Sequence, residues 1–279
     1  MQFKEEVFYF NFPYKIGSRL ITEKKIISII KNNKIISEIT TLEGLHKEDI
    51  YESLNDFKEK KYHLPSSKFS RSIYNYFKHN SVPKEIKTAY LWPIDFDAND
   101  REEIIIKIKV GRNDTKQDQQ TISNILASHK KLKLRIDGNK KCTSKKMLEI
   151  INGIPADKID YIEDSFINVK EEYDFFLETK LKIAMDEGIR NYFINKNWQE
   201  FPKHIKHVVI KPSLIGGLED LRYITKKLDQ KNITYNLSST FEGHLGLKFI
   251  YALSKRKVFK NMMTPGIDTL RFLTKKEGL

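Results

Sequence analysis

The chain has 279 residues, of which 39% are hydrophobic and 31% charged, a balance that is typical of a folded globular protein and excludes a disordered one. Its formal net charge is +13, but the lysines are scattered and no nucleic-acid-binding motif accompanies them, so we expect no nucleic-acid partner. The single cysteine, Cys142, excludes a disulfide framework within one chain. The sequence shows no secretory signal and no stretch of roughly 20 apolar residues, so we expect no membrane span and a cytoplasmic location.

Residues 1–87 predict a small α+β domain. Two isoleucine-rich runs, Lys25 to Ile30 and Lys34 to Ile39, flank Lys31-Asn32-Asn33, and asparagine tolerates the left-handed backbone of a tight turn, so a β-hairpin is expected. Amphipathic patterns predict helices over Lys47 to Lys61 and Ser66 to His79.

After Lys87, short β-rich apolar runs alternate with amphipathic segments of helical length. The predicted strands cover residues 88–92, 104–110, 132–136, 159–162, 181–185, 207–210 and 233–237, and the predicted helices cover 114–130, 144–151, 169–178, 187–193, 218–231 and 242–253. Such alternation indicates parallel strands joined by right-handed crossovers, in an open sheet or a closed barrel.

A polar residue stands at the C-terminal end of six of these runs. The six are Lys109, Asp137, Glu163, Asp186, Lys211 and Ser238, and successive members are 23 to 28 residues apart, about one strand–helix unit. In a barrel such ends meet at one mouth, whereas in an open sheet the first and last would lie far apart. The pattern therefore favours an α/β fold: a modified (β/α) barrel of the TIM type over residues 88–279, its C-terminal segment returning toward an N-terminal α+β capping domain of residues 1–87.

The types of residue at these ends suit a metal-assisted proton abstraction. Three convergent carboxylates, Asp137, Glu163 and Asp186, repel one another unless a cation bridges them, and an all-oxygen set selects a hard ion, Mg²⁺ with Mn²⁺ as a substitute. Any one of the acids alone could equally cap a helix. Lys107 and Lys109 share one face of their strand, and a neighbouring cation would lower the pKa of an amine enough to make it a base.

Seven motifs occur in one order along the chain: KIKVG, LRIDGN, YIEDSF, AMDEG, VVIKPSLIGGLED, LSSTFEGHLGL and PGIDTL. In this order and spacing they resemble the enolase superfamily and, more narrowly, the o-succinylbenzoate synthase family of the menaquinone pathway. Upstream, SEITTLEGLHKED resembles the segment in which that family's capping domain closes its hairpin and enters a helix.

The resemblance implies an enolase-like fold and a role for each matched residue. Lys109 would take the α-proton and then help the β-hydroxyl to leave, Lys211 would stabilise the enediolate from the opposite face, and Lys107 would tune Lys109. The remaining matched residues would bind Mg²⁺ (Asp137, Glu163 and Asp186) or contact the succinyl part of the substrate (Ser238 and Gly266). The implied reaction is that of a hydro-lyase, the dehydration of 2-succinyl-6-hydroxy-2,4-cyclohexadiene-1-carboxylate, so the expected partner is a small-molecule carboxylate; the oligomeric state is left open.

Three departures from the family pattern bear on loop geometry. Asp164-Ser165 replaces Glu-Pro, Glu187-Gly188 replaces Glu-Ser, and Thr240 replaces a serine. Two other functions stay open: an N-acylamino acid racemase or dipeptide epimerase that uses the same site, and a non-catalytic basic binding protein.

Three further features have ordinary interpretations. His204 and His207 are expected at the surface rather than on a metal. Gly216-Gly217 is expected to permit a tight βα turn, and Cys142 to be a buried or inert thiol.

Overall fold

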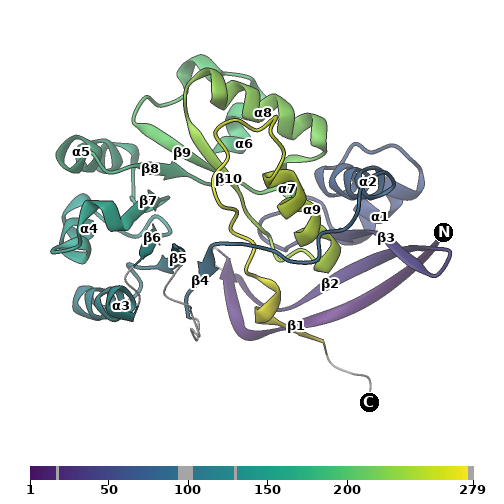
Figure 1. The fold of residues 1–279 in the computed structure, drawn as a ribbon, viewed down its shortest axis with the longest axis horizontal. Coiled ribbons are helices and arrows are strands. Elements are labelled where there is room, and N and C mark those ends of the chain that lie inside the picture. The colour runs from purple at the N-terminus through teal and green to yellow at the C-terminus, as the bar shows by residue number, and fades with distance from the viewer. Residues whose placement is uncertain (17–18, 94–102, 129–130, 276–279) are drawn as a thin grey trace. The chain divides into compact units, whose positions relative to one another are not determined.

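The computed structural model describes residues 1–16, 19–93, 103–128 and 131–275 and divides into two compact units (Figure 1). Unit 1 comprises Met1–Lys87, Ile210–Gln230 and Asn236–Leu279, and unit 2 comprises Thr88–Val209 and Lys231–Tyr235. The division into a capping domain of residues 1–87 and a barrel of residues 88–279 stays a prediction. No helix in the described part of the chain combines the length and the apolar character needed to cross a membrane.

Unit 1 contains a four-stranded antiparallel sheet in the order β11-β1-β2-β3. Its strands are β1 (Gln2–Ile16), β2 (Arg19–Lys31), β3 (Lys34–Thr40) and β11 (Leu273–Lys275). The predicted hairpin is β2–β3, and its turn residues Asn32 and Asn33 have φ values of 52° and 58°, the left-handed conformation for which asparagine is suited. Strand β1 was not predicted; it pairs along β2 over most of its length.

Helices α1 (Ile50–Lys58) and α2 (Pro65–Phe77) lie within the two segments predicted to be helical. Asp49 begins α1 with a capping box, since its side chain accepts from the backbone N–H of Glu52 while the Glu52 carboxylate accepts from that of Asp49. Apolar side chains of the sheet and of α1 form one buried cluster: Ile27, Ile29, Ile39, Ile50 and Phe57.

The second sheet has seven strands in the order β10-β9-β8-β7-β6-β5-β4. They are β4 (Tyr90–Leu91), β5 (Ile104–Lys109), β6 (Leu132–Asp137), β7 (Ile159–Glu163), β8 (Ile183–Met185), β9 (Ile205–Ile210) and β10 (Thr234–Leu237). All neighbours from β4 to β9 pair in parallel, and an isolated parallel bridge between Ser238 and Gly266 follows β10. Each strand lies beside the next one along the chain, as the α/β-barrel prediction requires.

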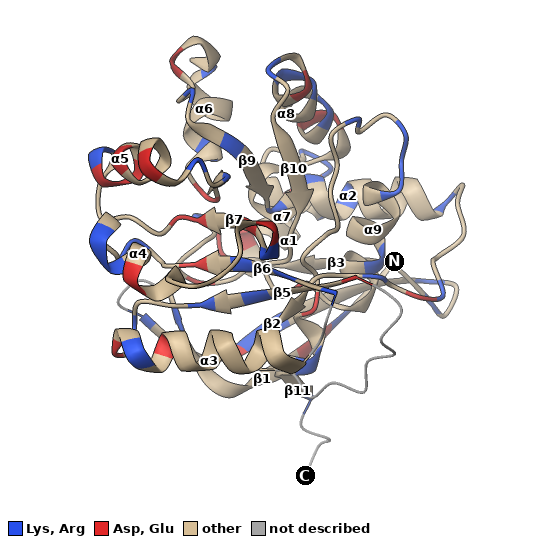
Figure 2. Ribbon diagram, turned by 60° about the vertical axis from the view of Figure 1, so that its left-hand side comes forward, with Lys and Arg blue, Asp and Glu red and all other residues tan. Residues whose placement is uncertain are grey.

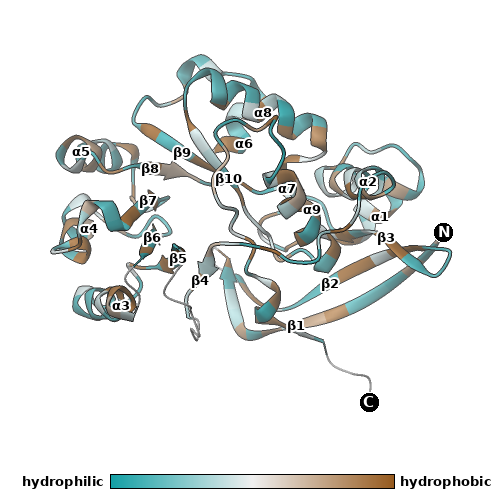
Figure 3. Cartoon of the chain, viewed as in Figure 1, coloured by the Kyte–Doolittle hydropathy of each residue, from teal (hydrophilic) through white to brown (hydrophobic). Residues whose placement is uncertain are grey.

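The predicted helices are present with small shifts at their ends. They are α3 (Thr115–Ser128), α4 (Ser144–Ile151), α5 (Val169–Thr179), α6 (Ile189–Asn195), α8 (Leu218–Gln230) and α9 (His244–Ser254). The last two positions of the predicted 114–130 helix lie outside the described residues. Helices α3, α4 and α5 lie on the outer side of the row of strands (Figure 1) and carry both hydrophilic and hydrophobic residues (Figure 3), as amphipathic helices on a buried sheet do.

Four short helices were not predicted. They are α7 (Pro212–Ile215) and the 3₁₀ turns η1 (Ala156–Lys158), η2 (Trp198–Glu200) and η3 (Leu270–Phe272). Between α7 and α8, Gly216 has φ 134° and the Gly217 N–H donates to the carboxylate of Asp220 at 3.0 Å. The glycine pair thus forms a tight turn in the connection from β9 to α8, but the short helix α7 separates it from the strand. Lys and Arg are spread over many elements and interspersed with Asp and Glu (Figure 2).

Candidate active site

The register of the parallel sheet aligns the ends of three neighbouring strands. Lys109 of β5 pairs with Asp137 of β6, and Asp137 pairs with Glu163 of β7. Paired residues of adjacent strands point to the same face of a sheet. Consequently one amine and two carboxylates project side by side from the edge of the parallel sheet where these strands end.

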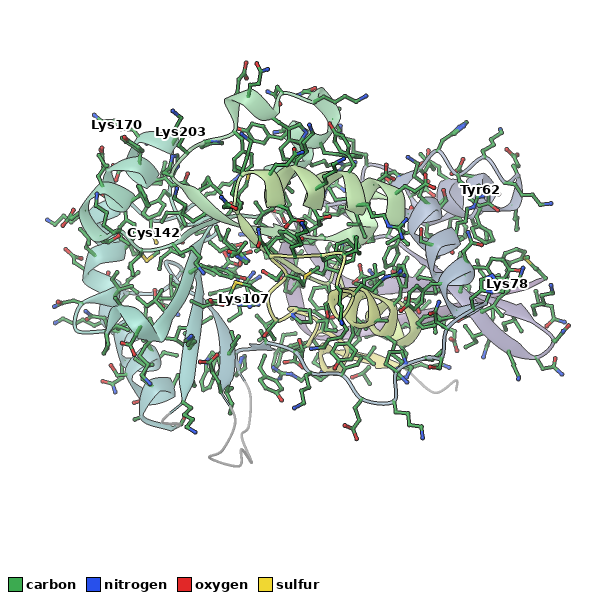
Figure 4. The ribbon with its side chains drawn as sticks, turned by 45° about the horizontal axis from the view of Figure 1, so that its top comes forward. Tyr62, Lys78, Lys107, Cys142, Lys170 and Lys203 are labelled. Atoms are coloured by element: carbon green, nitrogen blue, oxygen red, sulfur yellow. The ribbon has the colours of Figure 1, made fainter. Side chains whose placement is uncertain are left out.

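Lys107, two residues before Lys109, is the centre of this group. Its Nζ lies 2.9 Å from Oδ2 of Asp137 and 2.9 Å from Oε1 of Glu163. The Glu163 side chain is 1% exposed and that of Lys107 is 22% exposed, so the ion pairs are largely withdrawn from water. Lys107 lies among the strands in Figure 4, whereas Lys170 and Lys203 stand at the surface. The lysine inside the β5 strand is therefore the counter-ion of two buried acids.

Charges around Lys107 decide its protonation. Burial by itself lowers the pKa of Lys107, but the charges of Asp137, Glu163 and Asp186 outweigh burial and raise that pKa well above its ordinary value. For Asp137 the balance is reversed: burial raises its pKa, and the charges of Lys107 and Lys109 outweigh it and lower that pKa. At neutral pH, Lys107 is a fixed positive charge and Asp137 a fixed negative one.

Two residues that depart from the family pattern connect the loops behind the acids. The Ser165 hydroxyl donates to the Glu163 carbonyl at 2.9 Å and accepts from the Gly138 N–H at 3.0 Å. A Cβ on Gly138 would lie 2.7 Å from Ser165 Cβ, so only glycine allows this approach. Asp164 accepts from the Asp186 N–H at 3.1 Å, and burial, reinforced by the charge of Asp186, raises the pKa of Asp164 to about 7. These hydrogen bonds connect the loops that follow β6, β7 and β8.

The other three predicted site residues, Lys211, Ser238 and Gly266, belong to unit 1. Lys211 is the N-cap residue of α7, directly after β9. The Ser238 N–H donates to the Ile210 carbonyl at 2.8 Å, and the Ser238 hydroxyl donates to the Gly266 carbonyl at 3.0 Å. The structure therefore brings Ser238 and Gly266 into contact and links Ser238 to the residue that precedes Lys211.

The fit of a metal ion depends on the three acids of unit 2. Within the described ranges, no three His, Cys, Asp or Glu side chains are arranged so that they could hold a metal ion. Asp137 and Glu163 nevertheless converge on one positive group, the Lys107 ammonium, and the charge of Asp186 acts on the same group. In their chemistry, carboxylates around a positive charge suit a hard divalent ion. The assignment of Asp137, Glu163 and Asp186 as ligands of such an ion stays a prediction.

Sequence reasoning missed Arg135, which lies two residues before Asp137 and therefore on the same face of β6. Its side chain is 1% exposed, and its Nε donates to Asp160 Oδ2 at 2.8 Å. The guanidinium lies over the Tyr161 ring, 5.0 Å from its centre. The two-residue spacing that singled out Lys107 and Lys109 is the signal that could have found it.

The prediction that His204 and His207 lie at the surface is wrong. His204 is 6% exposed and its Nε2 lies 2.7 Å from Oε1 of Glu172. His207 is fully buried, stacks on Tyr161 with ring centres 4.4 Å apart, and is hydrogen-bonded through Nδ1 to Thr234 at 2.8 Å. His207 lies in β9 and His204 directly precedes it. A parallel strand is covered on both faces, so a polar residue in it can be buried. Cys142 is buried, as predicted.

Comparison with solved structures defines the class of fold. The L-Ala-D/L-Glu epimerase of Bacillus subtilis superposes with a TM-score of 0.70 at 16% identity, covering 98% of this chain and 90% of the other. The o-succinylbenzoate synthase of Thermosynechococcus elongatus, whose structure is complexed with Mg in the active site, gives 0.67 at 15% identity, covering 100% and 95%. The chain thus shares the fold of these two proteins, which confirms the predicted fold class, a (β/α) barrel preceded by an α+β portion.

In sequence, the chain is similar to o-succinylbenzoate synthases. It is 28% identical to that of Pasteurella multocida over 172 residues, which cover 60% of this chain and 50% of that protein. For the Aliivibrio fischeri enzyme the identity is 29% over 169 residues, covering 60% and 51%. The match spans about half the length of these curated relatives, and no family model matches. These relatives confirm the resemblance predicted from the motifs.

Proposed function

We propose that the chain is a Mg²⁺-dependent o-succinylbenzoate synthase that acts in menaquinone biosynthesis in the cytoplasm. Its reaction is the syn-dehydration of 2-succinyl-6-hydroxy-2,4-cyclohexadiene-1-carboxylate to 2-succinylbenzoate. The observation that carries the proposal is the ion-paired group at the sheet edge, in which Lys107 lies 2.9 Å from both Asp137 and Glu163 with Lys109 on the same face. Similarity to curated o-succinylbenzoate synthases supports this choice of reaction.

Lys109 is the proposed base. Its amine takes the proton from the carbon next to the substrate carboxylate, and the electron pair of that C–H bond moves toward the carboxylate to form an enediolate. The resulting ammonium then gives its proton to the β-hydroxyl, the C–O bond breaks, and water leaves. The ring becomes aromatic, which makes the elimination favourable.

The other residues stabilise charge and position the substrate. Lys107 has a pKa raised well above the ordinary value, so it stays protonated and acts electrostatically rather than as a base. Lys211 supplies positive charge to the enediolate, and Ser238 with Gly266 contacts the succinyl group. Asp137, Glu163 and Asp186 would hold Mg²⁺, which supplies Lewis-acid stabilisation of the substrate carboxylate when bound.

The test is an assay for dehydration with the purified hydroxycyclohexadiene substrate, with and without EDTA. We expect Mg²⁺-dependent turnover that Lys109→Ala and Lys211→Ala abolish while circular dichroism stays unchanged. Lys133→Ala is the matched control, because Lys133 comes from neighbouring β6 and pairs with Glu103 at the surface. Full turnover in EDTA, or in either active-site variant, would contradict the proposal.

A racemase or epimerase is the second candidate, because several solved structures of this fold carry such activities. The N-succinyl Arg/Lys racemase of Bacillus cereus superposes with a TM-score of 0.67 at 16% identity, covering 94% of this chain and 85% of the other. Incorporation of solvent deuterium into an N-succinyl amino acid, at a rate above that of dehydration, would favour it. Salt-sensitive polynucleotide binding that survives Lys109→Ala would instead favour a non-catalytic basic binding protein.

A further inference from the structure

We infer that Glu242 is a positioning residue of the proposed active site: its buried carboxylate joins the three segments of unit 1 that carry Lys211, Ser238 and Gly266. The inference rests on the proposed function, because it assigns those three residues to the site. It adds a residue of the LSSTFEGHLGL motif to which no catalytic or binding role was predicted.

The Glu242 side chain is fully buried and accepts four hydrogen bonds. Its Oε1 accepts from the hydroxyls of Ser213, at 2.7 Å, and Thr240, at 2.8 Å. Its Oε2 accepts from the hydroxyl of Ser239, at 2.6 Å, and from the Thr240 N–H, at 2.8 Å. Four donors saturate the lone pairs of one carboxylate, so the hydrogen-bonding capacity of this buried group is fully satisfied.

Each of these donors lies close in the chain to a proposed site residue. Ser213 is two residues after Lys211, and Ser239 directly follows Ser238. Because the single hydroxyl proton of Ser239 goes to Glu242, the hydroxyl of Thr269, 2.7 Å away, donates to Ser239. Thr269 is three residues after Gly266 and belongs to the same loop. One carboxylate therefore sets the spacing between a proposed catalytic amine and the proposed contacts for the substrate.

A second set of buried polar groups holds this carboxylate against the antiparallel sheet. The Lys24 ammonium of β2 donates to the Thr240 carbonyl at 2.9 Å, and the Glu38 carboxylate of β3 accepts from the Leu245 N–H at the start of α9, at 3.2 Å. A Cβ on Gly243 or on Gly246 would lie 2.6 or 2.5 Å from a Glu38 carboxylate oxygen. Both glycines of the sequence EGHLG are thus needed to admit Glu38.

The turn that aims Glu242 inward is strained. Phe241, the residue before it, has φ 63°, a left-handed conformation that non-glycine residues rarely adopt. Its ring packs edge-on against Phe10 and Tyr14 of β1, with centres 4.9 and 4.8 Å away. The aromatic cluster holds the turn in place and so holds the carboxylate under the site residues.

Two serine variants separate positioning from a merely structural role. Ser213→Ala removes the hydroxyl that links the segment of Lys211 to Glu242 and to Thr240, so kcat should fall about tenfold or more with little change in KM, as expected for a misplaced catalytic group. Ser239→Ala removes the hydroxyl through which Glu242 reaches the segments of Ser238 and Gly266, while the hydrogen bond from the Ser239 N–H to the Gly266 carbonyl remains, so KM should rise with a smaller effect on kcat. Mg²⁺ affinity should not change in either, because the proposed ligands belong to unit 2.

Hydrogen exchange measured by mass spectrometry tests the same network without relying on turnover. Glu242→Gln should speed exchange in the peptides that cover residues 211–217, 237–243 and 264–270. The control is Asp56→Asn: Asp56 is also buried and accepts from a serine hydroxyl, Ser67, and from backbone N–H groups, but none of its partners is a site residue. The control should speed exchange only around residues 63–67.

The two measurements distinguish the possible failures. A wild-type chain without dehydratase activity would end the proposed function, and hydrogen exchange would still decide whether Glu242 joins the three segments. Unchanged exchange there in Glu242→Gln would overturn the inference. So would wild-type kcat and KM in both serine variants of an active enzyme, a result that holds even if Glu242→Gln fails to fold.

Discussion

Replacing Glu38 with glutamine removes a buried carboxyl group whose protonation depends on the fold. Burial is the main cause that raises the pKa of Glu38 from 4.5 to about 7; the N–H groups of Gly246, Gly243 and Leu245 lower it, and the charge of Glu242 raises it. The other facing charge is Lys24, whose own pKa burial lowers to about 8 against the opposing charges of Glu242 and Glu38.

The sign of the effect follows from which state holds the proton more tightly. Between pH 4.5 and 7 the folded chain keeps the Glu38 proton and the unfolded chain loses it, so the stabilisation is fully present below about pH 4.5 and is lost as the pH rises to about 7. One pKa unit corresponds to about 1.4 kcal/mol. Integrated from pH 5 to 7.5, the loss is about 2 kcal/mol for this single group.

Glutamine is neutral throughout, so Glu38→Gln should lack this term. We expect the variant to gain about 2 kcal/mol of unfolding free energy relative to wild type as the pH rises from 5 to 7.5. Urea denaturation at several pH values within that range measures the difference, and groups unaffected by the substitution cancel from it. Ser37→Ala, at an uncharged buried residue of the same strand, is the control and should differ from wild type by a constant amount.

A difference between Glu38→Gln and wild type that does not vary with pH would refute this reasoning. It would mean that the Glu38 carboxyl titrates alike in the folded and unfolded chains. A change in the denaturant slope would instead show that the substitution alters the denatured state.

Three further substitutions test the site and the core. Lys107→Ala leaves Asp137 and Glu163 without their shared cation, so it should lower the free energy of unfolding in EDTA by about 3–5 kcal/mol. In thermal unfolding, added Mg²⁺ should restore part of this loss. An unchanged melting temperature in EDTA would contradict the ion pairs. Asp137→Asn should weaken Mg²⁺ binding about tenfold or more by calorimetry, and unchanged affinity would count against the ligand assignment. Phe249→Ala removes a fully buried ring that meets Phe69 edge-on. In urea denaturation the free energy of unfolding should fall by about 3–5 kcal/mol. A decrease below about 1 kcal/mol would be inconsistent with that packing.

The order and type of the elements could be predicted because local physics dominates them. Buried parallel strands are continuous β-branched runs, and their helices are amphipathic with identifiable caps, such as Thr143 before α4 and Asn168 before α5. Helix α4 covers residues 144–151, as predicted. Strand β11 is three residues long and pairs only with β1, far away in the chain, so no local pattern announced it.

The sequence by itself determined which charged residues stand at the strand ends, because a two-residue period places Lys107 and Lys109 on one face whatever surrounds them. Tertiary structure decided the partners: the pairing of Lys109 with Asp137 and of Asp137 with Glu163 sets which acids the Lys107 ammonium reaches. Strand register depends on contacts across the sheet, which the order of residues in one strand does not specify.

The buried polar groups of unit 1 show the same division. In the sequence, Glu242 is one more acid before a helix, and Lys24 and Glu38 are charges on strands that could face water. They are buried together because β2, β3 and the segment before α9 meet in the fold. The protonation of a buried group is set by the neighbours that remote segments bring to it, so only the tertiary structure decides which of these charges the protein uses.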